Sequence, residues 1–138
     1  MRVFLDSDVL LDYLTARKPF VEEIKIIINK GIIGELKLFT SSLIIANIHY
    51  FISKAENSRK AIYKIEKLIS FIKILNVGEK EIIQSLKSKF KDFEDCIQNC
   101  CASNSTMDLI ITRNIKDFKL SDLPILTPKE FVTQLENR

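Results

Sequence analysis

The 138-residue chain is poor in the residues that interrupt a fold, and it contains no long hydrophobic stretch. Only three glycines and three prolines occur, so most of the chain is available for helices and strands. No apolar run exceeds four residues, as at residues 43–46, which is too short to cross a bilayer. An acidic residue already at position 6 argues against an N-terminal signal sequence. We therefore expect a protein without membrane association.

Cysteine and histidine are scarce and are placed unsuitably for several kinds of chemistry. The three cysteines lie within residues 96–101, and the one histidine, His49, lies between apolar residues of a predicted helix. An odd, clustered set of thiols does not resemble a secreted disulfide framework, and it lacks the Cys/His pairing of a zinc site. A Gly-rich phosphate loop and a nucleophile elbow are also absent. We expect free thiols and a cytoplasmic location.

The charges of the chain are nearly balanced. Lysine and arginine total 21 and aspartate and glutamate 18, so the formal net charge is +3. This small excess permits a nucleic-acid partner but does not require one. With 46% hydrophobic and 28% charged residues, the composition is that of a globular protein.

Short apolar strands alternate with helical segments along the chain. The hydrophobic spacing predicts five strands, at residues 2–5, 36–40, 74–77, 109–112 and 124–126. This alternation favours an α/β three-layer sandwich, in which a central, mostly parallel β-sheet is flanked by helices. The length suits one domain, and no linker interrupts residues 1–138. Ligands of such sheets bind beyond the carboxyl ends of the strands, so the polar residues found there are candidates for chemistry.

Two pairs of aspartates are the first candidates. Asp6 directly follows the first strand, and Asp8 comes two residues later. Both positions suit a catalytic carboxylate and also suit the cap of a helix that begins near residue 9. Asp92 and Asp95 share one face of a predicted helix, where they either point at a metal ion or form an ordinary solvated stripe.

Further polar candidates follow the fourth strand and lie in the third predicted helix. Thr112, Asn114 and Asp117 lie at the exit of the fourth strand, in a segment that is also compatible with a simple polar turn. Asn47 borders the apolar face of its helix. A buried amide costs about 1–3 kcal/mol unless it finds partners. Asn47 is therefore either a satisfied core amide or an inward-facing ligand.

The order of these segments resembles one family. Residues 3–14, VFLDSDVLLDYL, resemble the start of a PIN domain, where an aspartate at the end of a strand precedes a short helix. Residues 40–43 resemble the second motif of that family, residues 92–96 the third and residues 111–118 the fourth. The resemblance covers nearly the whole chain and is strongest to bacterial PIN proteins of the VapC toxin type. It implies the PIN-like form of the α/β sandwich.

The resemblance also implies a function, a metal endoribonuclease that uses Mg²⁺ or Mn²⁺ to cut single-stranded or structured RNA. Asp6 and Asp95 would be the principal metal-binding carboxylates, joined by Asp117. Asn47 and Asn114 stand at catalytic positions where the family normally has a glutamate and an aspartate, so the cluster carries less negative charge. The expected supporting residues are Asp8, Asp92 and Thr112.

The resemblance implies partners as well, and two alternatives stay open. VapC-type proteins form homodimers and bind a small antitoxin that inserts into the active-site groove, as toxins of toxin–antitoxin pairs. The two asparagines motivate the first alternative, a degenerate PIN domain that binds RNA or protein without cutting. The second alternative is a phosphatase of the haloacid-dehalogenase type, because residues 4–9 resemble its Asp-x-Asp signature, with Asp6 as nucleophile. The later lysine and acidic-loop motifs of such phosphatases are absent.

Overall fold

The centre of the fold is a five-stranded sheet in which every neighbouring pair of strands is parallel. The structure is a computed structural model that describes residues 1–138. The strand order is β3-β2-β1-β4-β5. The strands are β1 (Arg2–Leu5), β2 (Lys37–Ser41), β3 (Ile72–Leu75), β4 (Leu109–Ile111) and β5 (Ile125–Leu126). The predicted α/β architecture is confirmed.

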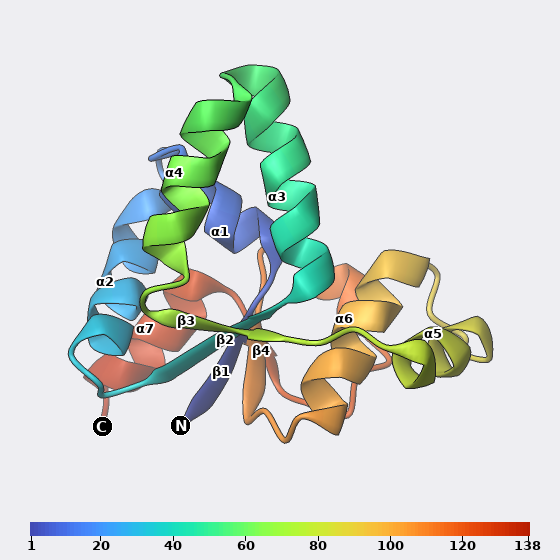
Figure 1. The fold of residues 1–138 in the computed structure, drawn as a ribbon. Helices are drawn as coiled ribbons and strands as arrows, with labels where there is room; N and C mark the ends of the chain where they lie inside the picture. The colour runs from blue at the N-terminus through green and yellow to red at the C-terminus, as the bar shows by residue number, and fades with distance from the viewer.

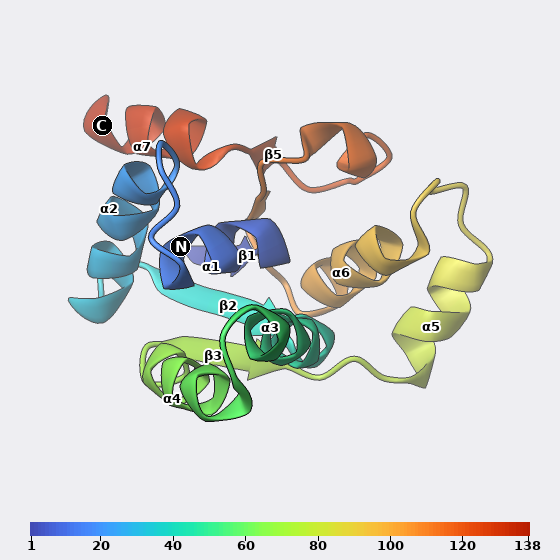
Figure 2. The ribbon, with the colours of Figure 1, turned by 90° about the horizontal axis from the view of Figure 1, so that it is seen from above.

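Helices cover both faces of this sheet. Figure 2 shows α2, α4 and α7 on one side and α5 and α6 on the other, and in Figure 1 α3 and α4 rise together above the sheet as a pair of neighbouring helices. None of the helices combines the length and hydrophobicity needed to span a membrane. The helices are α1 (Ser7–Leu14), α2 (Val21–Ile32), α3 (Ser42–Ala55), α4 (Ser58–Leu68), α5 (Glu79–Leu86), α6 (Phe93–Asn104) and α7 (Pro128–Glu136), with a 3₁₀ helix η1 (Ile115–Phe118).

The central strand β1 brings two distant parts of the chain together. Its residues Val3, Phe4 and Leu5 are fully buried, as expected for a parallel strand covered on both faces. The register with β4 pairs Leu5 with Ile111, and the Asp6 N–H donates to the Ile111 carbonyl at 3.0 Å. The polar residues that follow the two strands therefore leave the sheet side by side.

Among the predicted strands and the first helix, the starts of the first helix and of the third strand differ most from the sequence-based expectation, each by two residues. The first helix begins at Ser7 rather than near residue 9, because the Asp6 carboxylate accepts a hydrogen bond from the Ser7 N–H at 2.8 Å and caps it. The third strand begins at Ile72 rather than Ile74, because pairing of Ile72 with Leu38 of β2 sets its register. Strand pairing is a tertiary contact, so local hydrophobic spacing did not predict it.

An ion pair holds α1 against the segment that follows β4. Arg113 Nε donates to Asp12 Oδ2 at 2.6 Å, and Nη2 donates to Oδ1 at 3.3 Å. The Asp12 side chain is 2% exposed and that of Arg113 28%. The guanidinium also lies 4.0 Å from the centre of the Phe20 ring. Because one partner is buried and the pair is bidentate, this contact fixes the spacing between two strand exits.

Replacing Arg113 by methionine tests this contact. The change keeps most of the side-chain volume but leaves the buried Asp12 carboxylate without its cation. We expect the free energy of unfolding, measured with urea, to fall by about 3 kcal/mol, near the lower limit for removing one partner of a buried ion pair because Arg113 is partly exposed. Lys25→Met is the control, since Lys25 pairs with Glu22 at 3.9 Å on the surface. Equal losses in the two variants would contradict the assignment.

Candidate active site

A hydrogen-bonded cluster lies at the exits of β1 and β4. The Thr112 hydroxyl donates to Asp6 Oδ2 at 2.9 Å and accepts from the Asn114 N–H at 3.0 Å. Asp8 Oδ2 accepts from the Arg113 N–H at 3.0 Å. Asp6 is 5% exposed and Thr112 is fully buried. These contacts hold the Asp6 carboxylate in one orientation at the carboxyl end of the sheet.

Two further carboxylates join from α6 and η1. Asp95 lies in the first turn of α6, where its N–H donates to Asp92 Oδ1 at 2.9 Å, so Asp92 acts as the N-cap. Asp117 lies in η1, and its Oδ2 accepts a hydrogen bond from Asn114 Nδ2. Helix α6 packs against both β4 and η1. Four carboxylates, those of Asp6, Asp8, Asp95 and Asp117, are hereafter the carboxylate cluster.

Helix α6 is also fixed to the end of β2. The Ser41 hydroxyl donates to the buried Gln98 Oε1, and Ser41 Oγ accepts from the Ile44 N–H at 3.1 Å as the N-cap of α3. Gln98 lies one turn after Asp95 on α6. The same serine therefore starts α3 and holds the helix that carries Asp95.

Burial, and to a smaller extent the negative charge of Asp8, raise the pKa of Asp6 to about 6. Hydrogen bonds from Ser7 and Thr112 favour the charged form and oppose the rise. Burial also raises the pKa of Asp8, and the N–H and the positive charge of Arg113 oppose that shift. The interior of the cluster thus disfavours negative charge unless a cation compensates it.

The pKa of Asp95 rises to about 7, and part of this rise comes from neighbouring carboxylates. Burial contributes most, followed by the negative charges of Asp6, Asp92 and Asp117. Charges act on one another in this way only when they are close. The carboxylates of Asp6, which follows β1, of Asp95 in α6 and of Asp117 in η1 therefore lie near one another.

The donor set of this space fits a hard divalent cation. Its side chains offer oxygen donors only, and Asp8 Oδ1 is buried without a hydrogen-bond donor. No three acidic, histidine or cysteine side chains converge closely enough to hold a metal ion. Mg²⁺ requires only one or two carboxylates, because it keeps several of its waters. Asp6 and Asp95 are the carboxylates that could hold such an ion, and Mn²⁺ accepts the same oxygen ligands.

The two asparagines predicted at catalytic positions, Asn47 and Asn114, have different surroundings in the structure. Asn47 is partly buried in α3, and no hydrogen bond joins its amide to the cluster. Asn114 uses its side-chain nitrogen on Asp117 and so orients a carboxylate. Sequence analysis did not identify Arg113 or Gln98 as parts of the site. Neither carries a local signal, because their partners are distant in the sequence.

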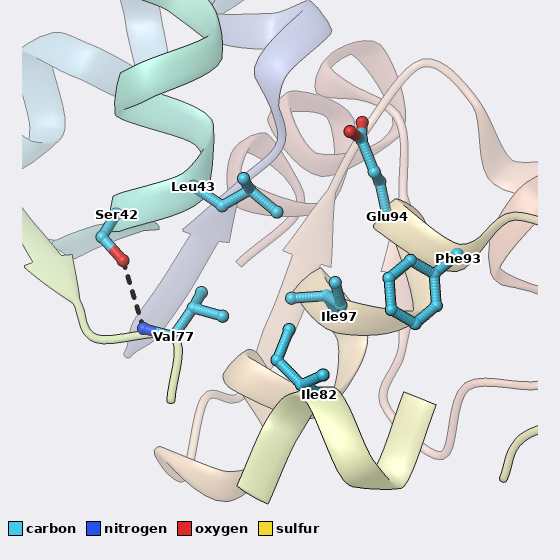
Figure 3. A pocket seen from close by; sticks show the side chains of 7 residues that line it. All are labelled: Ser42, Leu43, Val77, Ile82, Phe93, Glu94 and Ile97. Atoms are coloured by element: carbon cyan, nitrogen blue, oxygen red, sulfur yellow. Dashed lines mark hydrogen bonds between the residues drawn. The ribbon is translucent and has the colours of Figure 1, made fainter. Parts of the chain in front are cut away.

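An apolar hollow of about 390 Å³ lies between the start of α3, α5 and α6. Figure 3 shows Leu43, Val77, Ile82 and Ile97 turned toward one another, whereas the Glu94 carboxylate points away from Ile82 and Ile97. Its remaining lining residues are Ser42, whose hydroxyl oxygen accepts from the Val77 N–H at 3.1 Å, and Phe93. This hollow offers no inward acidic group and adds no ligand to the carboxylate cluster.

Comparisons with known proteins agree with this geometry. Residues 2–116 match the family model described as PIN domain. The chain is 30% identical to Ribonuclease VapC1 of Aquifex aeolicus (strain VF5) over 139 aligned residues, which cover 94% of this chain and 92% of the relative.

Solved structures share the fold. DNA-bound VapBC from Salmonella typhimurium superposes with a TM-score of 0.73 at 16% identity, covering 93% of this chain and 98% of that one. A toxin–antitoxin complex from Klebsiella pneumoniae superposes with a TM-score of 0.68 at 21% identity, covering 91% and 97%. These identities are too low to show more than a common fold. The family model and the 30% identical relative show that the chain belongs to the PIN-domain family.

Proposed function

We propose that residues 1–138 form one PIN domain that acts as an endoribonuclease dependent on Mg²⁺ or Mn²⁺. The carboxylate cluster carries this proposal, because Asp6 and Asp95 come from different parts of the chain and the charge of Asp6 raises the pKa of Asp95. Family membership and the relative named a ribonuclease support it. Both observations favour the nuclease over the phosphatase interpretation, in which Asp6 would be a nucleophile.

The proposed chemistry assigns a role to each side chain. Asp6 and Asp95 hold the cation, and Asp117, oriented by Asn114, adds a third negative charge. A bound divalent cation supplies charge neutralisation at the phosphate and a more acidic water. Thr112 keeps the Asp6 carboxylate in position through its hydroxyl. The supporting residues are Asp8, which anchors the segment after β4, and Asp92, which caps α6.

Asp117 also compensates for the negative charge that is missing at position 114. Asn114 donates to Asp117, so the amide and the carboxylate form one unit at the exit of β4. The acid of this motif is then three residues later in the chain. No corresponding acid accompanies Asn47, and this keeps the non-cutting, RNA-binding or protein-binding domain as the second candidate.

The family relationship also suggests partners. We propose that the chain is the cytoplasmic toxin of a toxin–antitoxin pair, that its partner is a small antitoxin and that it forms a homodimer. The similar fold of the toxin–antitoxin complex from Klebsiella pneumoniae supports the antitoxin.

Asp6→Asn and Asp95→Asn test the catalytic assignment. Both changes keep the side-chain size but remove a negative charge from the cation site. We expect each to lower the rate of Mn²⁺-dependent cleavage of single-stranded RNA by at least about 100-fold, the cost typical of removing one group that stabilises transition-state charge. Cleavage is followed on gels with purified protein, and EDTA should abolish it.

Asp122→Asn is the control, because Asp122 is an exposed carboxylate outside the cluster. It should cut RNA at the wild-type rate. Binding of RNA without any metal-dependent cutting by the wild type would support the degenerate domain instead. Hydrolysis of a generic phosphomonoester that disappears in Asp6→Asn would support the phosphatase.

The raised pKa values predict how stability depends on pH in the metal-free protein. The pKa values of Asp6 and Asp95 rise from 3.8 in the unfolded chain to about 6 and about 7, so the folded state holds protons that the unfolded state releases. Stability is therefore highest below about pH 4 for these two groups and is lost as pH rises toward 7. We expect the Tm measured in EDTA to fall between pH 5 and pH 7.5.

Two comparisons assign this fall to the cluster. Asp95→Asn should show a smaller fall, because position 95 no longer ionises. Saturating Mn²⁺ should raise the wild-type Tm most at the higher pH, where both carboxylates are charged. An Asp95→Asn curve parallel to that of the wild type would remove Asp95 as the cause.

The oligomeric state can be measured directly. One chain has a mass of 15.9 kDa, so light scattering at micromolar concentration should report twice this value for the proposed homodimer. A mass of 15.9 kDa under the same conditions would contradict the dimer.

A further inference from the structure

Four lysines surround a hollow of about 370 Å³ next to Asp117. Two of them come from the loop before α6 and two from η1 and the residue that follows it. The hollow is hereafter the lysine cradle, and its lining residues are Lys89, Phe90, Lys91, Lys116, Asp117, Lys119 and Leu120.

An aromatic contact explains why lysines from two segments meet here. Phe90 and Phe118 pack edge to face, with ring centres 6.4 Å apart and planes at 82°. Phe118 is 1% exposed, and Phe90 packs against the hydrophobic core. Lys89 and Lys91 flank Phe90 in the sequence, whereas Lys116 lies two residues before Phe118 and Lys119 directly follows it. Burying the two rings therefore leaves the four ammonium groups at the surface around one hollow.

The lining of the lysine cradle carries a net positive charge. All four lysines are exposed, and none takes part in any of the ion pairs of the structure. Together with Asp117 they give the lining a formal charge of +3, which equals that of the entire chain. The rest of the molecule is therefore neutral on balance. An uncompensated patch of this kind attracts a polyanion.

Asp117 connects the lysine cradle with the carboxylate cluster. It lines the cradle, and its charge raises the pKa values of both Asp6 and Asp95. An anionic chain bound on the cradle would therefore continue directly to the cation held by those two carboxylates.

We propose that the lysine cradle binds the phosphodiester backbone of the substrate RNA next to the phosphate that is cut. The proposal rests on the proposed ribonuclease function. Lysine ammonium groups act as point charges that contact phosphate oxygens and carry no base specificity. The cradle thus supplies affinity and positions the strand, whereas any sequence preference arises elsewhere. Contacts to phosphate do not involve the 2′-hydroxyl, so single-stranded DNA should bind the cradle equally well.

The double variant Lys89→Gln/Lys116→Gln tests the proposal with one lysine removed from each segment. Binding of a labelled single-stranded RNA to the full chain is measured by fluorescence anisotropy in EDTA, which prevents cutting, between 0.05 and about 0.3 M salt. Each lost phosphate contact lowers the slope of log K against log salt by about 0.7, so we expect a decrease of about 1.4. At about 0.1 M salt this corresponds to roughly 10- to 30-fold weaker binding.

The matched control is Lys37→Gln/Lys73→Gln, which removes the same charge. Both lysines are exposed and unpaired, and they line a different hollow, between α2, β2 and β3. This control should keep the wild-type slope, and single-stranded DNA should lose the same affinity as RNA in the cradle variant. An equal decrease in both variants, or none in the cradle variant, would overturn the proposal, and the latter would leave the cradle to a different partner such as an acidic protein segment.

These experiments distinguish a wrong assignment of the lysine cradle from a wrong assignment of the ribonuclease function. If the wild type cuts RNA and the cradle variant binds it normally, only the cradle assignment is wrong. If the wild type neither cuts nor binds RNA, the proposed ribonuclease function is wrong, and the cradle proposal is overturned with it.

Discussion

The parallel pairing of β1 with β4 is the constraint on which the site depends. Because Leu5 lies opposite Ile111, Asp6 and Thr112 emerge together, and the Thr112 hydroxyl can donate to the Asp6 carboxylate. A shift by one residue would turn these side chains to the opposite faces of their strands. The fully buried apolar residues of both strands resist such a shift. Core packing therefore determines the geometry of a polar site.

In the absence of a cation, the carboxylate cluster lowers the stability of the folded protein. Burial and repulsion by neighbouring carboxylates raise the pKa values of Asp6 and Asp95, so ionised carboxylates at this point oppose folding. Hydrogen bonds from Thr112 and the segment after β4 recover only part of this cost. The same features that destabilise the metal-free site favour a divalent cation, because it would relieve the repulsion. Binding affinity and local instability thus share one electrostatic origin.

The carboxylate cluster and the lysine cradle have opposite charge and share Asp117. In the proposed function, the backbone of a polyanionic substrate would be attracted by the lysines, whereas its reacting phosphate would approach the carboxylates only through a cation. The Phe90–Phe118 contact and the Asn114–Asp117 hydrogen bond place the two surfaces next to each other. The local packing of η1 therefore sets the relative positions of the negative carboxylate cluster and the positive lysine cradle.

The sequence by itself determined the alternation of strands and helices, and it placed Asp6, Asp95 and Thr112 among the candidates, because strand ends and helix caps leave local patterns. Boundaries that depend on pairing, such as the start of β3, were misplaced by two residues. The Asp12–Arg113 pair, the Ser41–Gln98 bond and the lysine cradle were decided only by the tertiary structure. Each joins residues far apart in the chain, and such contacts arise from strand register and ring packing, which leave no periodic signal in the sequence.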